Sequence, residues 1–330
     1  MPQRTEIRRT ASFLAALCVL ALAACAPRIA PPGGGAATPA LATDYFLTAD
    51  GMRLPLRVWP TDAPPRAVFL ALHGFNDYSK SFEAPAAAWR KSGIAVYAYD
   101  QRGFGAAPGH GLWPGVAAMT GDLVVASRLL RARYPGTPLY LLGESMGASV
   151  ILAAFAGDER PDADGVVLSA PAVWARRFMP GYQRVALWLG AHTVPWLKVT
   201  GQGLKIRASD NNEMLRALGR DPLVIKGTRI DALYGLTNLM DAALAAAPKL
   251  DIRTLILYGR VEQLIPESAR RAILAALPKD GAWRHIEYES GFHMLLRDLN
   301  ADIVLRDIAV WVTGTTDAGT SFANRSGAAP

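Results

Sequence analysis

The chain has 330 residues, 51% of them hydrophobic, which is enough for one large domain with an insertion. Its formal net charge of +7 is scattered, with no basic block interleaved with aromatic residues, so the composition excludes a nucleic-acid-binding surface. The cysteines, Cys18 and Cys25, both lie near the N-terminus, and the histidines form no His-x-x-x-His pair. The rest of the chain therefore carries no disulfide, and no metal site is predicted.

The first residues have the pattern of a secretory signal. Residues 1–24 begin with arginines and continue with an apolar run that is too short to span a bilayer with ease. Their end, Leu22-Ala23-Ala24-Cys25, resembles the lipobox of bacterial lipoproteins, which implies lipidation of Cys25. Since alanine and not aspartate follows the cysteine, we expect a lipid-anchored protein of the bacterial outer membrane facing the periplasm. An ordinary signal peptide cut beside Cys25 is the alternative.

The remaining chain divides by composition into a linker, a folded domain and a tail. Residues 25–43 are rich in Pro, Gly and Ala and are expected to form a tether. Residues 44–313 form the predicted domain, and residues 314–330 a disordered tail.

Strands and helices alternate through this domain, which predicts an α/β fold with a mostly parallel sheet covered by helices on both faces. The alternation breaks at about residues 171–225, where a mostly helical cap is expected to be inserted. The predicted strands are Tyr45–Thr48 and Leu54–Trp59 (a hairpin), Ala67–Leu72, Ile94–Tyr99, Pro138–Leu142, Gly165–Ser169, Thr254–Tyr258 and Trp283–Tyr288.

The stretch Gly143-Glu144-Ser145-Met146-Gly147 lies between a predicted strand and a predicted helix. Strand, Gly-x-Ser-x-Gly and helix together are typical of a nucleophile elbow, in which the serine backbone is strained and its hydroxyl is exposed. A larger side chain in place of either glycine would collide with the neighbouring strand or helix. An ordinary strand-to-helix turn is the alternative interpretation.

A serine nucleophile needs an imidazole to accept its proton and a carboxylate to orient that imidazole. When the serine lies on an elbow of this type, the acid and then the histidine follow it in the chain, each after a strand. Glu262 follows the strand Thr254–Tyr258, and His293 follows the strand Trp283–Tyr288. Glu267 and Glu289 are the competing carboxylates.

The chain resembles the α/β-hydrolase superfamily and, within it, the monoacylglycerol lipase and lysophospholipase-like group. The resemblance implies the α/β-hydrolase fold, Ser145 as nucleophile, His293 as base, and the backbone N–H groups of Phe75 and Met146 as an oxyanion hole. The family usually has Asp where this chain has Glu262. The matching stretches are His73–Phe75, Asp100–Gly105, Gly143–Gly147, Asp221–Val224, Gly259–Pro266 and Gly291–Arg297.

The predicted cap is rich in large apolar residues. Trp174, Phe178, Trp188 and Trp196 are the candidates for contact with a substrate acyl chain. Packing inside the cap is the alternative role for these residues.

The sequence therefore predicts a serine hydrolase that cleaves the carboxylic esters of single-chain lipids, such as monoacylglycerol or lysophospholipid, through an acyl-enzyme. No cofactor is implied, and the sequence leaves the oligomeric state open. An acyltransferase or an aminopeptidase with the same triad is an alternative, and so is a catalytically dead lipid-binding lipoprotein.

Overall fold

The computed structural model of the chain describes residues 26–314, except residues 202, 204 and 205. The predicted signal peptide, Cys25 and all but the first residue of the predicted tail lie outside the described residues. Within the described residues, no helix combines the length and the apolar character needed to cross a bilayer.

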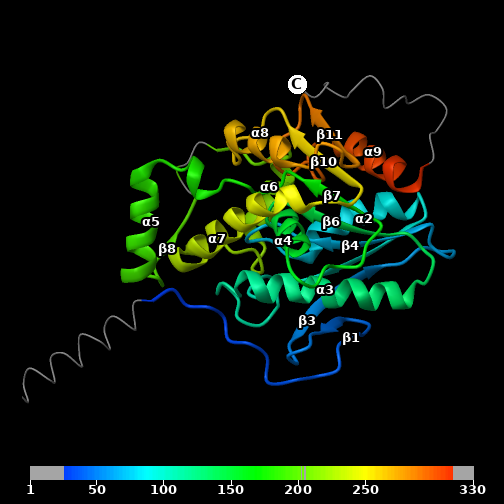
Figure 1. The fold of residues 1–330 in the computed structure, drawn as a ribbon, viewed down its shortest axis with the longest axis horizontal. Helices are drawn as coiled ribbons and strands as arrows, with labels where there is room; N and C mark the ends of the chain where they lie inside the picture. The colour runs from blue at the N-terminus through cyan, green and yellow to red at the C-terminus, as the bar shows by residue number, and fades with distance from the viewer. Residues whose placement is uncertain (1–25, 202, 204–205, 315–330) are drawn as a thin grey trace, which may run out of the picture.

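The centre of the molecule is a sheet to which nine strands of the described chain belong, in the order β1-β2-β3-β5-β4-β6-β7-β10-β11 (Figure 1). The pairs β1–β2, β2–β3 and β3–β5 are antiparallel, and the other neighbours are parallel. The predicted mostly parallel sheet is thus confirmed. The strands are β1 (Ala40–Leu41), β2 (Tyr45–Leu47), β3 (Arg53–Trp59), β4 (Ala67–Leu72), β5 (Ile94–Tyr99), β6 (Leu139–Glu144), β7 (Gly165–Ser169), β10 (Thr254–Gly259) and β11 (Trp283–Tyr288).

Helices cover both faces of this sheet because its central strands are apolar on both sides. On β4, for example, Phe69 contacts Trp89 of α2, while its neighbour Leu70 belongs to the core of the opposite face. The helices α2 (Glu83–Arg90) and α9 (Ala301–Thr313) cover the first face. The second face packs against α3 (Val116–Arg133), α4 (Met146–Phe155), α7 (Ile230–Ala246) and α8 (Glu267–Ala276).

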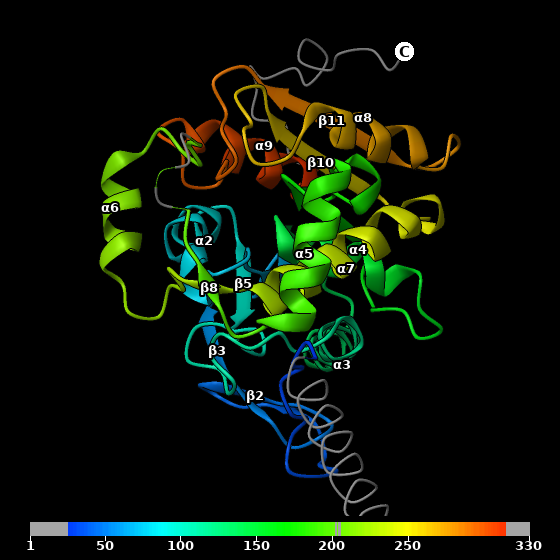
Figure 2. The ribbon, with the colours of Figure 1, turned by 90° about the vertical axis from the view of Figure 1, so that its left-hand side faces the viewer.

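The predicted cap is inserted between β7 and α7. It contains the short 3₁₀ helix η2 (Arg176–Phe178), the helices α5 (Gly181–Thr193) and α6 (Asn212–Arg220), and the strands β8 (Lys198–Val199) and β9 (Thr228–Arg229). Figure 2 faces this side of the molecule and shows α5 and α6 as separate helices. The two strands pair antiparallel, so the insertion ends at β9 and not at residue 225 as expected. Such short strands carry no periodicity by which a sequence pattern identifies them.

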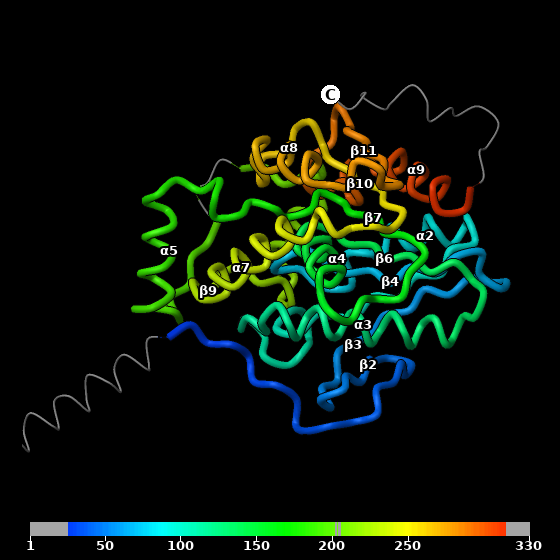
Figure 3. Tube along the Cα trace, in the orientation of Figure 1, coloured from blue at the N-terminus to red at the C-terminus, as the bar shows by residue number. Residues whose placement is uncertain are grey.

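The segment expected to be a free tether lies along the domain instead (Figure 3). The Ala30 N–H donates to the Trp113 carbonyl at 2.7 Å, and the Gly33 N–H donates to Asp50 Oδ2, also at 2.7 Å. Residues Ala40–Leu41 form β1 at the edge of the sheet. From residue 26 on, the segment predicted as a tether is thus attached to the domain by these contacts. Its attachment uses backbone groups, which composition does not reveal.

Candidate active site

Ser145 occupies the turn between β6 and α4, with φ 53° and ψ −110°, a conformation that non-glycine residues rarely adopt. A Cβ atom on Gly143 would lie 2.4 Å from the Ala148 nitrogen, and one on Gly147 would lie 2.1 Å from the Leu72 carbonyl oxygen. Both glycines are thus required by the helix on one side and by β4 on the other. This is the geometry that the sequence predicts for a nucleophile elbow.

His293 lies between Ser145 and Glu262, and the three side chains form one hydrogen-bonded chain. Its Nε2 atom is 2.9 Å from Ser145 Oγ, and its Nδ1 atom is 2.6 Å from Glu262 Oε2. The side chain of Glu262 is fully buried, and its Oε1 accepts hydrogen bonds from the N–H groups of Leu264 at 2.6 Å and Ile265 at 3.2 Å. The carboxylate is therefore held from both sides, as a group that fixes the tautomer of a histidine must be.

The two competing carboxylates lie elsewhere. Glu267 forms an ion pair with Arg271, and Glu289 forms one with Arg260; both glutamates are mostly exposed. The structure thus brings Glu262 to the histidine and leaves Glu267 and Glu289 in surface ion pairs.

Two glycines that the sequence analysis did not single out hold the acid loop against the histidine loop. A Cβ atom on Gly259, at the end of β10, would lie 2.1 Å from the Gly291 carbonyl oxygen. That same oxygen accepts a hydrogen bond from the Val261 N–H at 3.0 Å. In the sequence, Gly259 directly follows the predicted strand Thr254–Tyr258, and Gly291 lies three residues after the strand Trp283–Tyr288; a glycine at such a position often marks a close backbone approach.

Electrostatics favour a charged acid beside a basic imidazole. Burial is the largest influence on the pKa of His293 and lowers it, but the attraction of Glu262, Glu144 and Asp298 leaves this pKa above its ordinary value. Burial likewise raises the pKa of Glu262, while His293 and the two backbone N–H donors lower it, with a net shift downward. The pair is therefore suited to hold a proton on His293 while Glu262 stays ionised.

Of the predicted oxyanion donors, Met146 directly follows Ser145 in the chain, and Phe75 belongs to the loop after β4. Met146 is the first residue of α4, where backbone N–H groups have no partner within the helix. Gly74, beside Phe75, approaches the nucleophile so closely that a Cβ atom there would be 3.5 Å from Ser145 Cβ.

His73 fixes the backbone at the start of this oxyanion loop. Its Nδ1 lies 2.8 Å from the Gly74 carbonyl oxygen, and its Nε2 accepts a hydrogen bond from the Gln101 N–H at 3.0 Å. Burial lowers the pKa of His73, so the ring is neutral and donates from Nδ1. These contacts give His73 a structural role beside the site.

A buried charge cluster, absent from the sequence analysis, joins the loops around the site. One nitrogen of Arg297 lies 2.7 Å from Asp77 Oδ2 and 3.0 Å from Glu144 Oε2. Asp77 belongs to the oxyanion loop, Glu144 precedes the nucleophile, and Arg297 follows the histidine. Removal of one member would leave an uncompensated buried charge. In the sequence, the position of Glu144 at the end of an apolar strand indicates a buried charge that needs a partner.

The structure does not gather the four candidate cap aromatics. Trp174 and Phe178 are half-buried and pack against the main core. Trp188 and Trp196 are 52% and 53% exposed, and Trp188 stacks on His192 with ring centroids 4.5 Å apart. The last two tryptophans therefore form neither an acyl site around Ser145 nor a core inside the cap.

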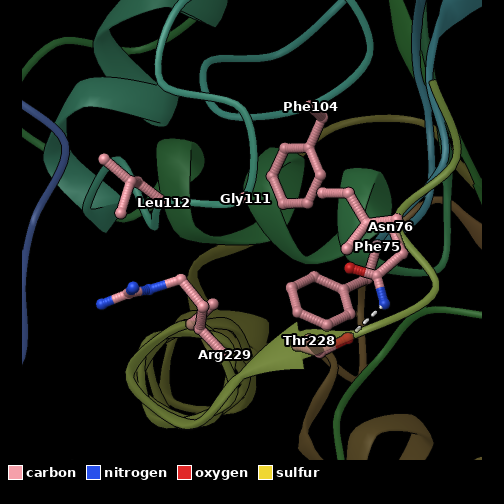
Figure 4. A pocket seen from close by; sticks show the side chains of 9 residues that line it. Phe75, Asn76, Phe104, Gly111, Leu112, Thr228 and Arg229 are labelled. Atoms are coloured by element: carbon pink, nitrogen blue, oxygen red, sulfur yellow. Dashed lines mark hydrogen bonds between the residues drawn. The ribbon is translucent and has the colours of Figure 1, made fainter. Parts of the chain in front are cut away.

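A small cavity of about 10 Å³ lies where the oxyanion loop meets the cap (Figure 4). Phe75, Phe104 and Leu112 give it apolar walls, and Asn76, Thr228 and Arg229 contribute polar groups. Among the described residues, no cluster of three or more metal-ligating side chains occurs.

Comparison with known proteins places this geometry in context. The chain is 27% identical to human monoglyceride lipase over 290 residues, covering 84% of this chain and 92% of the relative. It is 26% identical to the monoacylglycerol lipase of Mycolicibacterium smegmatis over 274 residues, covering 81% and 95%.

Solved structures support the same fold. The monoacylglycerol lipase of Paleococcus ferrophilus superposes with a TM-score of 0.63 at 20% identity, covering 79% of this chain and 98% of that chain. A soluble variant of monoglyceride lipase from Saccharomyces cerevisiae, in complex with a substrate analog, gives a TM-score of 0.65 at 20% identity, covering 88% and 100%. Residues 63–300 match the family model described as serine aminopeptidase, S33. The chain therefore belongs to this Hydrolase_4 family of α/β-hydrolases.

Proposed function

We propose that the protein hydrolyses carboxylic esters of single-chain lipids through an acyl-enzyme on Ser145. The observation that carries this proposal is the hydrogen-bonded chain from Ser145 Oγ through His293 to the buried carboxylate of Glu262. A serine in this arrangement is activated as a nucleophile without a metal or cofactor.

The proposed reaction has two halves. His293 Nε2 takes the proton of Ser145 Oγ as this oxygen attacks the ester carbonyl, and the N–H groups of Phe75 and Met146 stabilise the oxyanion. The imidazolium, whose charge Glu262 balances, then returns the proton to the leaving alcohol. A water molecule activated by His293 next attacks the acyl-enzyme, which releases the fatty acid and restores Ser145.

The substrate class rests on the relatives and on the cap. Two relatives that cover most of this chain are named as lipases of monoacylglycerol. The half-buried Trp174 lies two residues after Ala172, whose N–H donates to the Ser145 carbonyl, so it is the cap aromatic proposed to contact an acyl chain. Each buried methylene of such a chain contributes up to about 0.8 kcal/mol. Monoacylglycerol and lysophospholipid are therefore the proposed substrates, and a second acyl chain is expected to be excluded by the cap.

A peptidase is the second candidate, because the matching family model is described as a serine aminopeptidase. The same triad would then cleave the amide bond of an N-terminal amino acid. An acyltransferase differs only in the acceptor, which would be an alcohol in place of water.

A panel of substrates tests these candidates together. It contains acetyl, butanoyl and octanoyl esters, monooleoylglycerol, lysophosphatidylcholine, a triacylglycerol and an aminoacyl naphthylamide, with glycerol as an added acceptor. We expect kcat/KM to rise from acetyl to octanoyl esters and then to level off, with monoacyl lipids above triacylglycerol. Equal turnover of acetyl and octanoyl esters would contradict the lipid assignment, and preferred release of naphthylamine would favour the peptidase.

We further propose that Cys25 anchors the enzyme to the bacterial outer membrane by a lipid. The proposal is supported by the Leu22–Cys25 motif. The Arg28 N–H donates to Asp231 Oδ2 at 3.4 Å, at the start of α7, which places the chain shortly after Cys25 near the end of the cap insertion. The exposed cap residues Trp188 and Trp196 would then lie near the anchoring lipid. Cys25→Ser is expected either to release the protein from the membrane pellet into the soluble fraction or to leave its signal peptide uncleaved. A parent protein found wholly in the soluble periplasmic fraction would exclude the anchor.

A further inference from the structure

We propose that Asn76 is a positioning residue that couples the cap to the oxyanion hole through its hydrogen bond to Thr228. This inference rests on the proposed serine-hydrolase function, because it concerns how the Phe75 N–H is held in place. The contact joins two parts of the chain that are 152 residues apart.

The contact itself is short and specific. Asn76 Nδ2 donates to Thr228 Oγ1 at 2.7 Å, and the Asn76 carbonyl oxygen accepts from the Ile225 N–H at 3.0 Å. Thr228 is buried in β9, the strand with which the cap insertion ends. Figure 4 shows Asn76 reaching Thr228 from the loop that also carries Phe75. The cap thus holds both the side chain and the backbone of the residue that follows Phe75.

The carbonyl end of the peptide that carries the Phe75 N–H is held from within its own loop. This oxygen, that of Gly74, lies 2.8 Å from His73 Nδ1 and accepts from the Asp77 N–H at 3.3 Å. The His73 ring in turn accepts the Gln101 N–H just after β5, so the loop is supported beside the sheet through His73 and at the cap through Asn76. Because the hole acts only when its donors point at the developing charge, loss of one support is expected to reduce transition-state stabilisation more than ground-state binding.

A simpler role for Asn76 needs to be separated from this one. Its φ of 66° lies in the left-handed region, which asparagine tolerates better than most residues. If asparagine is present only to permit this backbone, glycine would serve equally well. If the side chain is the support, Asn76→Gly removes it while the backbone conformation stays accessible.

The experiment compares Thr228→Val, Thr228→Ser and Asn76→Gly with the parent on a medium-chain monoacyl ester. Thr228→Val keeps the size of the side chain and removes the acceptor, and Thr228→Ser restores the acceptor. We expect Thr228→Val and Asn76→Gly to lower kcat by about 10- to 100-fold with little change in KM, in line with the cost of a small misplacement near the chemistry. Thr228→Ser is expected to retain most of the parent activity.

An octyl trifluoromethyl ketone provides a second readout, since its adduct with Ser145 places an oxyanion in the hole. Its affinity is expected to fall in Thr228→Val and Asn76→Gly by the same factor as kcat/KM. Unchanged kcat and inhibitor affinity in either folded variant, or a change in KM alone, would overturn the support role while leaving ester hydrolysis intact. A folded parent that is inactive on every ester of the panel would instead overturn the proposed function and, with it, this inference.

Discussion

The carboxyl edge of the sheet and the cap are built in opposite ways. At the sheet edge, Gly147 and Gly259 allow backbones to approach so closely that any side chain would collide, and Glu262 is fully buried. In the cap, Trp188 and Trp196 are about half exposed. The sheet edge is thus specified by close packing, whereas the cap presents much of its apolar surface to the outside.

This contrast suggests a division of labour in the proposed enzyme. Bond-breaking requires atoms that stay in place, and the sheet edge supplies them. We propose that access and substrate choice depend on the cap, because an exposed apolar surface usually marks an interaction with other molecules. If the division holds, substitutions at the sheet edge will remove activity on every ester, and cap substitutions will change preference among esters.

The largest effect is expected from the nucleophile and the base. Ser145→Ala and His293→Ala are each expected to lower kcat by about 10⁴-fold or more, because the members of a triad act as a unit. The double variant is expected to be no worse than either single one. Steady-state kinetics on an octanoyl ester, with circular dichroism to verify folding, provides the measurement. Substantial activity in a folded Ser145→Ala protein would contradict the mechanism.

A slightly smaller effect is expected from the acid. Glu262→Gln keeps the shape but loses the charge that stabilises the imidazolium, so kcat is expected to fall by about 10³- to 10⁴-fold. Glu262→Asp is expected to be milder. Glu267→Gln and Glu289→Gln are matched controls, because their carboxylates form only surface ion pairs in this structure. A parent-like Glu262→Gln beside an inactive control would show that another residue is the acid.

The pH dependence tests the same pair on a finer scale. His293 must be neutral to accept the serine proton, so kcat/KM rises with pH through the pKa of His293 in the free enzyme. Since the structure raises this pKa above its ordinary value of 6.5, the midpoint of the acid limb is expected above pH 6.5. Glu262→Gln removes the main attraction to the imidazolium, and its residual activity is expected to show a lower midpoint. An unchanged midpoint would mean that His293 does not titrate against Glu262.

The smallest effects are expected in the cap, and they differ between its two sides. Trp188→Ala and Trp196→Ala are expected to leave kcat/KM on water-soluble esters close to that of the parent, as exposed positions usually do. Trp174 lies two residues after Ala172, whose N–H donates to the Ser145 carbonyl at 3.1 Å. Trp174→Ala is therefore expected to flatten the chain-length profile. Equal profiles for all three variants would remove the distinction between an inner and an outer cap surface.

The sequence predicts the parts of the site that are local or that follow chain order. Gly143 and Gly147 flank Ser145 within one turn, and Glu262 and His293 each follow a recognisable strand. The charge cluster around Arg297 escapes prediction, because its partners lie 153 and 220 residues away in the chain. Only the folded sheet brings them to one place.

The cap and the N-terminal segment show the other limit. Apolar composition predicts that Trp188 and Trp196 matter, but not whether they point inward or outward. The N-terminal segment has the composition of a linker and is nevertheless attached by backbone hydrogen bonds, such as that from the Ala30 N–H to Trp113. Contacts made by backbone atoms leave no mark on side-chain composition.

In the proposed mechanism, Ser145 is an activated nucleophile at the sheet edge. The most direct test is to treat the folded protein with a fluorophosphonate and to map the adduct by peptide mass spectrometry. We expect one adduct on Ser145, formed rapidly in the parent and far more slowly in His293→Ala. No adduct, or an adduct on another serine such as Ser149 or Ser290, would contradict it.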